Sequence, residues 1–194
     1  VVNRDDNGSL TYIEMKKDGI VGVYGLADPY SVTVSPDGKH VYAKSGYDDT
    51  IAMFSRNSST GALTFVEMHE DGVDGVDGLR GANSATVSPD GNHVYAAGYL
   101  DDAVAVFSRN PSTGALTFVE IQKDGVGGVD GLNGALFVTI SHDGNHVYAT
   151  GNLDDAVAVF SRNSSTGALT YIEMHEDNVD GVDGLGGASG ITLS

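Results

Sequence analysis

The chain has 194 residues, of which 10 are Lys or Arg and 27 are Asp or Glu, so its formal net charge at pH 7 is −17. This charge repels nucleic acid and anionic lipid, so neither is an expected partner. No apolar run approaches the roughly 20 residues of a membrane helix, which excludes membrane insertion, and the lack of cysteine excludes disulfides. The chain opens Val1-Val2-Asn3 without a signal segment, so we expect a processed or excerpted chain, with a secreted or cell-surface location favoured.

An internal repeat organises the whole sequence. The turn "VSPDGKHVYA" returns as "VSPDGNHVYA" and "ISHDGNHVYA", and its serine stands at positions 35, 88, 141 and 194, an interval of 53 residues. Repeats this similar indicate one structural unit used several times.

Each repeat contains four short apolar segments separated by turns. In chain order we expect an outer strand at 10–15, three four-stranded units at 31–68, 84–121 and 137–174, and an inner strand at 190–194. In the second unit, Pro89 favours a type I turn and Gly91 suits the left-handed position after it. The pattern predicts an all-β fold, a β-propeller built from four-stranded antiparallel blades, with residues 1–194 forming one partial ring.

Two stretches carry a family resemblance. "SPDGKHVYA" and "DDTIAMFSRNSSTGALT" resemble the lactonase-like, YVTN-type repeats of seven-bladed β-propellers. The resemblance covers the whole chain and implies a propeller of which this sequence supplies about half. Such repeats occur in sugar-lactone hydrolases and in surface proteins, so the resemblance implies no single function.

Two sets of loops concentrate the acidic residues. In a meander, the loops after the second and fourth strands of each unit share one face, which we call the acidic face. The expected ligand-binding residues there are Asp48, Asp49, Asp101, Asp102, Asp154 and Asp155, together with His69 and His175.

The loops after the fourth strands are rich in glycine and aspartate, as in "EDGVDGVDGLRGA". Carboxylates and backbone carbonyls are the ligands that Ca²⁺ takes, so we consider calcium a possible cofactor. The candidate ligands are Asp71, Asp74, Asp77, Asp124, Asp130, Asp177, Asp180 and Asp183. The alternative, which we favour because the spacing of a calcium loop is absent, is a solvated acidic loop whose glycines provide left-handed turns.

Equivalent positions of the aligned repeats form columns, and three columns outside the acidic loops carry polar side chains. His40, His93 and His146 each follow an Asp-Gly turn, and we expect them to bond the turn aspartate rather than a metal. The arginines of "SRN" are expected to brace the adjacent loop, and the tyrosine column is expected to pack.

The similarity of the repeats favours a multivalent binding module for a glycan, a cation or a protein. A catalytic site needs unlike residues in one place, whereas equal blades present one weak site several times. The alternative is a sugar-lactone hydrolase, and a structural surface protein is a third possibility. Half a ring exposes two apolar blade faces, so the expected partner is a second copy in a ring-closing assembly, or the missing remainder of the chain.

Overall fold

The computed structural model describes residues 1–192, which form strands joined by turns and loops. Three antiparallel four-stranded sheets hold their strands in chain order. Blade 1 contains β3 (Pro29–Val34), β4 (His40–Ser45), β5 (Thr50–Arg56) and β6 (Leu63–Glu70). Blade 2 contains β7 (Ala82–Val87), β8 (His93–Gly98), β9 (Ala103–Arg109) and β10 (Leu116–Lys123). Blade 3 contains β11 (Ala135–Ile140), β12 (His146–Gly151), β13 (Ala156–Arg162) and β14 (Leu169–Glu176).

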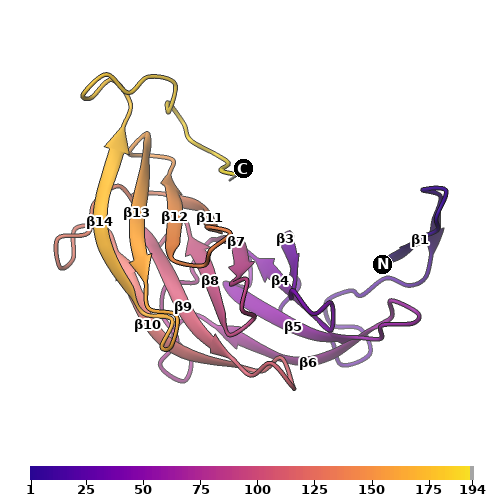
Figure 1. Cartoon of the computed structure of the whole chain (residues 1–194). Helices are drawn as coiled ribbons and strands as arrows, with labels where there is room; N and C mark the ends of the chain where they lie inside the picture. The colour runs from indigo at the N-terminus through magenta and orange to yellow at the C-terminus, as the bar shows by residue number, and fades with distance from the viewer. Residues whose placement is uncertain (193–194) are drawn as a thin grey trace.

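The three blades fan out side by side around a common axis (Figure 1). The first strands β3, β7 and β11 are neighbours across the blades, whereas β6, β10 and β14 lie at the outer edge. This arrangement confirms the prediction of an all-β partial propeller. No helix within residues 1–192 is long and apolar enough to cross a membrane.

The middle strands are apolar at nearly every position because they are covered on both sides. In β9, the residues from Ala103 to Phe107 are all fully buried. The outer strand β6 instead alternates between half-buried and exposed positions, as a strand with one solvated face does. Between blades 1 and 2, Tyr42, Ile51 and Met53 pack in one cluster with Leu79 and Phe107. The burial of these facing surfaces holds neighbouring blades together.

The turn after each first strand is closed by its serine. Ser35 Oγ donates to Asp37 Oδ1 at 2.6 Å and accepts from the His40 amide at 3.0 Å, and Ser88 does the same in blade 2. The expectation that the histidine rings bond the turn aspartates is therefore wrong for His40 and His93. The serine hydroxyl takes the aspartate, and each ring faces the next blade instead.

An arginine at the end of each third strand connects consecutive blades. Arg109 donates from Nε to Tyr42 Oη at 2.6 Å and from Nη2 to His40 Nδ1 at 2.7 Å, while Nη1 reaches Gly91 O within its own blade. Tyr42 Oη in turn donates to Gly114 O at 2.7 Å. This arrangement, which we call the arginine junction, makes the tyrosine column polar as well as packed.

Blade 3 repeats the junction with blade 2. Arg162 donates to Tyr95 Oη at 2.7 Å, to His93 Nδ1 at 2.7 Å and to Asp90 Oδ2 at 2.7 Å. Burial raises the pKa of Tyr95 to about 12, and burial followed by the Arg162 charge lowers the pKa of His93. The imidazole is therefore neutral at pH 7, and its Nδ1 can accept the hydrogen bond that the guanidinium donates.

The chain ends differ from the expected outer and inner strands. Residues 10–12 form β2 (Leu10–Tyr12), which pairs with β1 (Val2–Arg4) in a separate two-stranded sheet. Glu14 nevertheless accepts the Leu63 amide at 2.5 Å, as Glu67 accepts the Leu116 amide at 2.8 Å, so it occupies the place of a preceding outer strand. Residues 190–192 form no strand, and positions 193–194 of the expected inner strand lie outside the described residues.

Candidate functional site

The side chains of the paired aspartates on the acidic face accept hydrogen bonds from backbone amides of the loops. The first aspartate of each pair binds the glycine-rich loop of its own blade: Asp101 Oδ2 accepts the Arg80 amide at 2.9 Å. The second binds the loop that leads into the next blade: Asp102 Oδ1 accepts the Gly134 amide at 2.8 Å. The equivalent bonds are Asp48 to Ala27, Asp154 to Asn133, Asp49 to Gly81 and Asp155 to Gly187. These carboxylates therefore fasten loops, which explains their repetition without a ligand.

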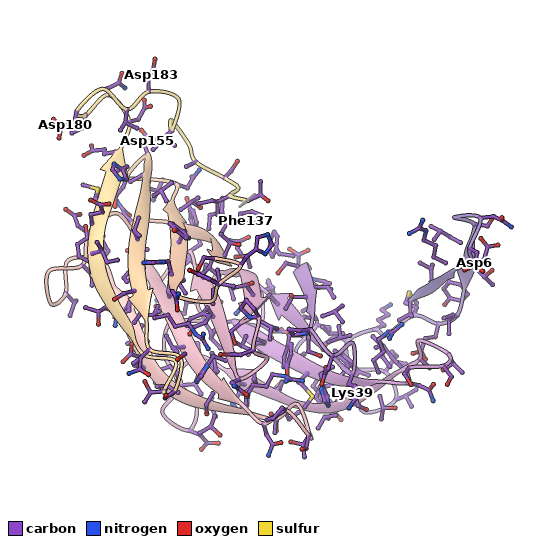
Figure 2. All side chains as sticks on the ribbon, in the orientation of Figure 1. Asp6, Lys39, Phe137, Asp155, Asp180 and Asp183 are labelled. Carbon is purple, nitrogen blue, oxygen red and sulfur yellow. The ribbon has the colours of Figure 1, made fainter. Side chains whose placement is uncertain are left out.

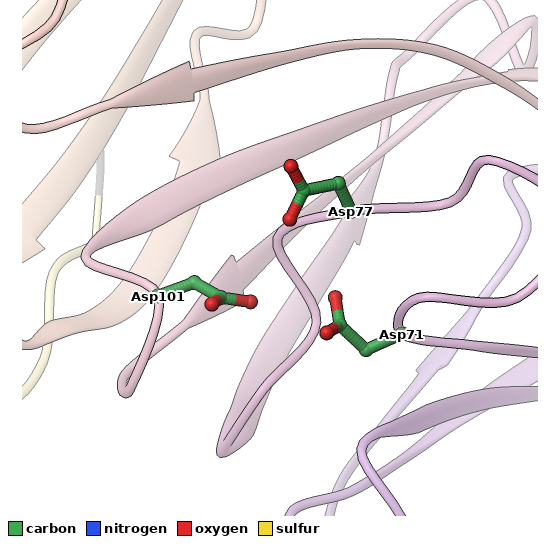
Figure 3. A group of neighbouring side chains, drawn as sticks. All are labelled: Asp71, Asp77 and Asp101. Carbon is green, nitrogen blue, oxygen red and sulfur yellow. The ribbon is translucent and has the colours of Figure 1, made fainter.

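The structure brings two groups of predicted metal ligands together, each with one member of an aspartate pair. The ligand atoms of Asp71, Asp77 and Asp101 lie within 4.8 Å of one another, and Asp124, Asp130 and Asp154 form the matching group one repeat later. Figure 3 shows the side chains of the first group. We call these groups the aspartate triads. Burial, and then the charges of Asp71 and Asp77, raise the pKa of Asp101.

The remaining metal candidates lie apart from the triads. Asp74 and Asp180 sit at exposed loop tips with φ of 52° and 50°. Asp177 accepts the Leu185 amide at 2.8 Å, and Asp183 is exposed in the same loop, which stands away from the sheets with Asp180 (Figure 2). Within residues 1–192, no third acid joins Asp177 and Asp183 in a potential metal site.

The two predicted ligand histidines belong to the outer strands. His69 lies on β6 with Nε2 3.3 Å from Glu67 Oε1, and its ring centroid is 5.7 Å from that of Phe107. His175 lies on β14 beside Glu173, at 3.5 Å. The ends of these strands lie beside the aspartate pairs, but among the described residues no hydrogen bond or ion pair joins either histidine ring to a paired aspartate.

Departures from the repeat concentrate where the inner strands begin. Four columns at this end carry a different residue in each blade: Ala27, Arg80 and Asn133; Tyr30, Asn83 and Leu136; Lys44, Ala97 and Thr150; Gly46, Tyr99 and Asn152. The register of every inner strand shifts at this end, between Pro29 and Ser31 in blade 1 and at the equivalent positions in blades 2 and 3. Such bulges are frequent beside active sites because they redirect side chains.

Five polar members of these columns surround the start of β7 and β11, and we call them the axial polar cluster: Arg80, Asn83, Tyr99, Asn133 and Asn152. Asn83 Nδ2 donates to Gly81 O at 3.1 Å, and the Tyr99 amide donates to the same oxygen at 3.3 Å. The Tyr99 ring also lies 3.1 Å from the position that a Cβ on Gly134 would occupy, so it links blades 2 and 3. Arg80 is exposed, and the other four side chains are half-buried.

The cluster adjoins the first aspartate triad. Arg80 follows Asp77 by three residues, and its amide binds Asp101 of the triad. Arg80, the three asparagines, Tyr99 and Asp77 thus lie on loops and strand ends at the same end of blades 2 and 3. The sequence analysis missed this cluster, and the four divergent columns, compared with one another, are the signal in the sequence that could have located it.

Comparisons with known proteins identify the family of the chain. The family model "Lactonase, 7-bladed beta-propeller" matches residues 81–180, just over half of the chain. The chain belongs to this lactonase family of seven-bladed β-propellers. No curated protein matches it.

Solved structures of similar proteins include two from Bacteroides. A provisionally assigned 6-phosphogluconolactonase from Bacteroides fragilis is 25% identical with a TM-score of 0.64, over 80% of this chain and 39% of that one. Another, from Bacteroides uniformis, is 26% identical with a TM-score of 0.66, over 85% and 44%. The periplasmic gluconolactonase of Pseudomonas aeruginosa shares the fold at 23% identity and a TM-score of 0.67, over 84% and 41%. The chain therefore spans less than half of the length of these proteins.

The family membership and these relatives correct the functional expectation. The multivalent binding module is wrong, and the sugar-lactone hydrolase is the better supported alternative. The similarity of the blades, which suggested repeated ligand sites, has another cause. The repeated aspartates, arginines and tyrosines bind loops and neighbouring blades.

Proposed function

We propose that this chain contributes the active site of a sugar-lactone hydrolase. The observation that supports the proposal most directly is the match to the lactonase family over residues 81–180, which include Asn83, Tyr99, Asn133 and Asn152 of the axial polar cluster and begin directly after Arg80. The relatives at 25% and 26% identity bear the name of a 6-phosphogluconolactonase, so the proposed substrate is a phosphorylated sugar lactone.

Lactone hydrolysis makes clear chemical demands on such a site. The oxygen of a water molecule bonds to the carbonyl carbon, the ring C–O bond breaks, and the ring oxygen leaves as a hydroxyl group. One group must accept the proton of the attacking water, and a donor must stabilise the oxyanion that forms on the carbonyl oxygen.

The residues around Arg80 can supply the proton acceptor and the charge that binds the substrate. Asp77 is exposed and uses Oδ1 for the Gly78 amide at 2.9 Å, while no described residue donates to Oδ2. We assign Oδ2 of Asp77 the role of proton acceptor, and the Arg80 guanidinium the binding of the negative charge of the substrate. Amides such as those of Asn83 and Asn133 suit the hydroxyl groups of a sugar.

The proposal is tested by measuring acid release from 6-phosphogluconolactone and from unphosphorylated gluconolactone above the spontaneous rate. Asp77→Asn is expected to lower kcat about 100-fold, and Arg80→Ala is expected to raise KM mainly for the phosphorylated lactone. Asp74→Asn, at an exposed loop tip outside the triad, and Arg4→Ala, on β1, are the matched controls. A chain that accelerates hydrolysis of neither lactone, or an Asp77→Asn variant as active as Asp74→Asn, would overturn the proposal.

The location of the protein is part of the same proposal. One structural relative is named as a periplasmic enzyme, which supports a secreted or periplasmic location for this chain. Cell fractionation of the source organism with an antibody against the chain tests this assignment.

A further inference from the structure

A lysine without a hydrogen-bond partner lies buried between blades 1 and 2. Lys44 on β4 is 0% exposed, and no described residue accepts a hydrogen bond from its Nζ. Ala97 and Thr150 take its place in the other two blades, so the fold does not require an amine at this position. Burying an amine without a partner destabilises a protein, which makes such a group a candidate for a role other than packing.

The amine is covered by the glycine-rich loop 71–81, which joins the two blades. Ala97, which takes the place of Lys44 in blade 2, packs in one cluster with Leu132. One repeat earlier, Leu79 stands in the column of Leu132, and it is fully buried in the cluster between blades 1 and 2. The amine of Lys44 therefore lies beneath Leu79, and withdrawal of this leucine from the cluster would let water reach Nζ.

Two carboxylates in the surrounding loops act on the amine. Asp49 lies between β4 and β5, and Asp71 lies at the start of the covering loop; their charges favour the ammonium form, although neither bonds Nζ directly. The residues paired with Lys44 on the neighbouring strands are Ser31 and Ile51, which carry no charge. Burial outweighs the two aspartates and lowers the pKa of Lys44 to about 7.

The same two aspartates hold the covering loop in place. Asp49 Oδ1 accepts the Gly81 amide at 2.6 Å, and Asp71 Oδ1 accepts the Leu79 amide at 3.0 Å. The Arg80 amide between them is bound by a third aspartate, in the loop after β8. The segment that carries Arg80 is therefore held at three successive amides, directly above the buried amine.

We propose that Lys44 controls the opening of loop 71–81: the charged amine favours an open form in which water hydrates it, and the uncharged amine favours the closed form. Opening moves the amine into water, where its pKa is that of an ordinary lysine, so the open form takes up a proton that the closed form resists. As the pH falls from 10.5 to about 7, opening is therefore promoted. Below pH 7 it changes no further, because the amine is then charged in both forms.

This opening would also move two residues of the proposed active site. Asp77 and Arg80 lie on loop 71–81, so Lys44 is a positioning residue for both of them. Only this consequence rests on the proposed function. The opening itself is a property of the contact between blades 1 and 2 and can be measured without a lactone.

Hydrogen exchange of the backbone amides 79–81 measures the opening, because each of these amides is bound by a carboxylate that must release it. Between about pH 7.5 and 9, the protection of these amides should rise about tenfold per pH unit. The amides 132–134 bind aspartates in the same way one repeat later, and alanine takes the place of Lys44 beside them. They are the internal control, and their protection should stay nearly constant.

Replacement of Lys44 by methionine completes the test. In Lys44→Met, the amides 79–81 should lose the pH dependence and exchange at least about tenfold more slowly at pH 7.5 than in the wild type. Lys39→Met, in the exposed turn before β4, should behave as the wild type. The same pH dependence at amides 79–81 and 132–134 would mean that Lys44 acts on global stability alone, and it would contradict the proposal. A pH dependence that persists in Lys44→Met would do so too.

Discussion

Replacing Lys44 by methionine should stabilise the protein, and the gain should depend on pH. Lys44 lies on β4 between blades 1 and 2, is 0% exposed, and its Nζ has no hydrogen-bond partner among the described residues. The same column holds Ala97 and Thr150, so neither neighbouring blade needs a cation there. Methionine preserves most of the side-chain volume without the charge.

The magnitude follows from the pKa of the amine. Burial lowers the pKa of Lys44 from 10.5 to about 7, and the charges of Asp49 and Asp71 oppose this shift only in part. At 1.36 kcal/mol per unit, the charged form is disfavoured by up to about 5 kcal/mol. Relaxation around a buried charge reduces such penalties, so we expect Lys44→Met to raise the free energy of unfolding by about 2–3 kcal/mol at pH 6.

The direction in which the pKa of Lys44 is shifted determines how the free energy of unfolding depends on pH. Below pH 7, Lys44 is charged in both the folded and the unfolded state, so its full penalty is present. Between pH 7 and 10.5, the unfolded state binds the additional proton, and stability of the wild type rises with pH. The advantage of the variant should therefore be largest at pH 6 and vanish near pH 10.5.

Urea unfolding followed by circular dichroism, at pH 6 to 10 and at low protein concentration, measures this difference. Lys39→Met, at an exposed position in the turn before β4, is the matched control and should change little. A Lys44→Met variant that is less stable at pH 6, or whose gain stays constant across this pH range, would refute the reasoning.

Three further outcomes are expected. Tyr42→Phe removes the hydroxyl between Arg109 and Gly114 and should cost about 1–3 kcal/mol of unfolding free energy in urea. Tyr148→Phe should cost almost nothing, because the Tyr148 hydroxyl has no hydrogen-bond partner among the described residues. Asp102→Ala and Asp102→Gly both lose the hydrogen bond to the Gly134 amide. Because position 102 has a φ of 54°, which glycine adopts without strain, the alanine variant should have the lower melting temperature. Equal melting temperatures of the two variants would contradict this. Calcium at about 5 mM should raise the melting temperature by about 2–4 °C through the aspartate triads, and equal effects of magnesium would argue against a specific site.

The fold could be predicted because its determinants are local and repeated. A period of 53 residues, Pro-Asp-Gly turns and strands apolar on both faces indicate four-stranded blades packed against one another. The expected hydrogen bond between the His40 ring and Asp37 does not form, because the Ser35 hydroxyl donates to the Asp37 carboxylate instead. The imidazole contacts Arg109, and the position of that arginine depends on how the next blade packs.

The candidate site could likewise be predicted from the sequence only in part. The sequence alone determined that aspartates crowd the loops of one face, since strand order decides on which face a loop lies. Only the tertiary structure decided which loop amide donates a hydrogen bond to each aspartate. Asp102 binds an amide 32 residues further along the chain, and the Tyr99 ring reaches Gly134 only because two blades pack side by side. Contacts between blades depend on how the sheets stack around the axis, and no local pattern of residues encodes that geometry.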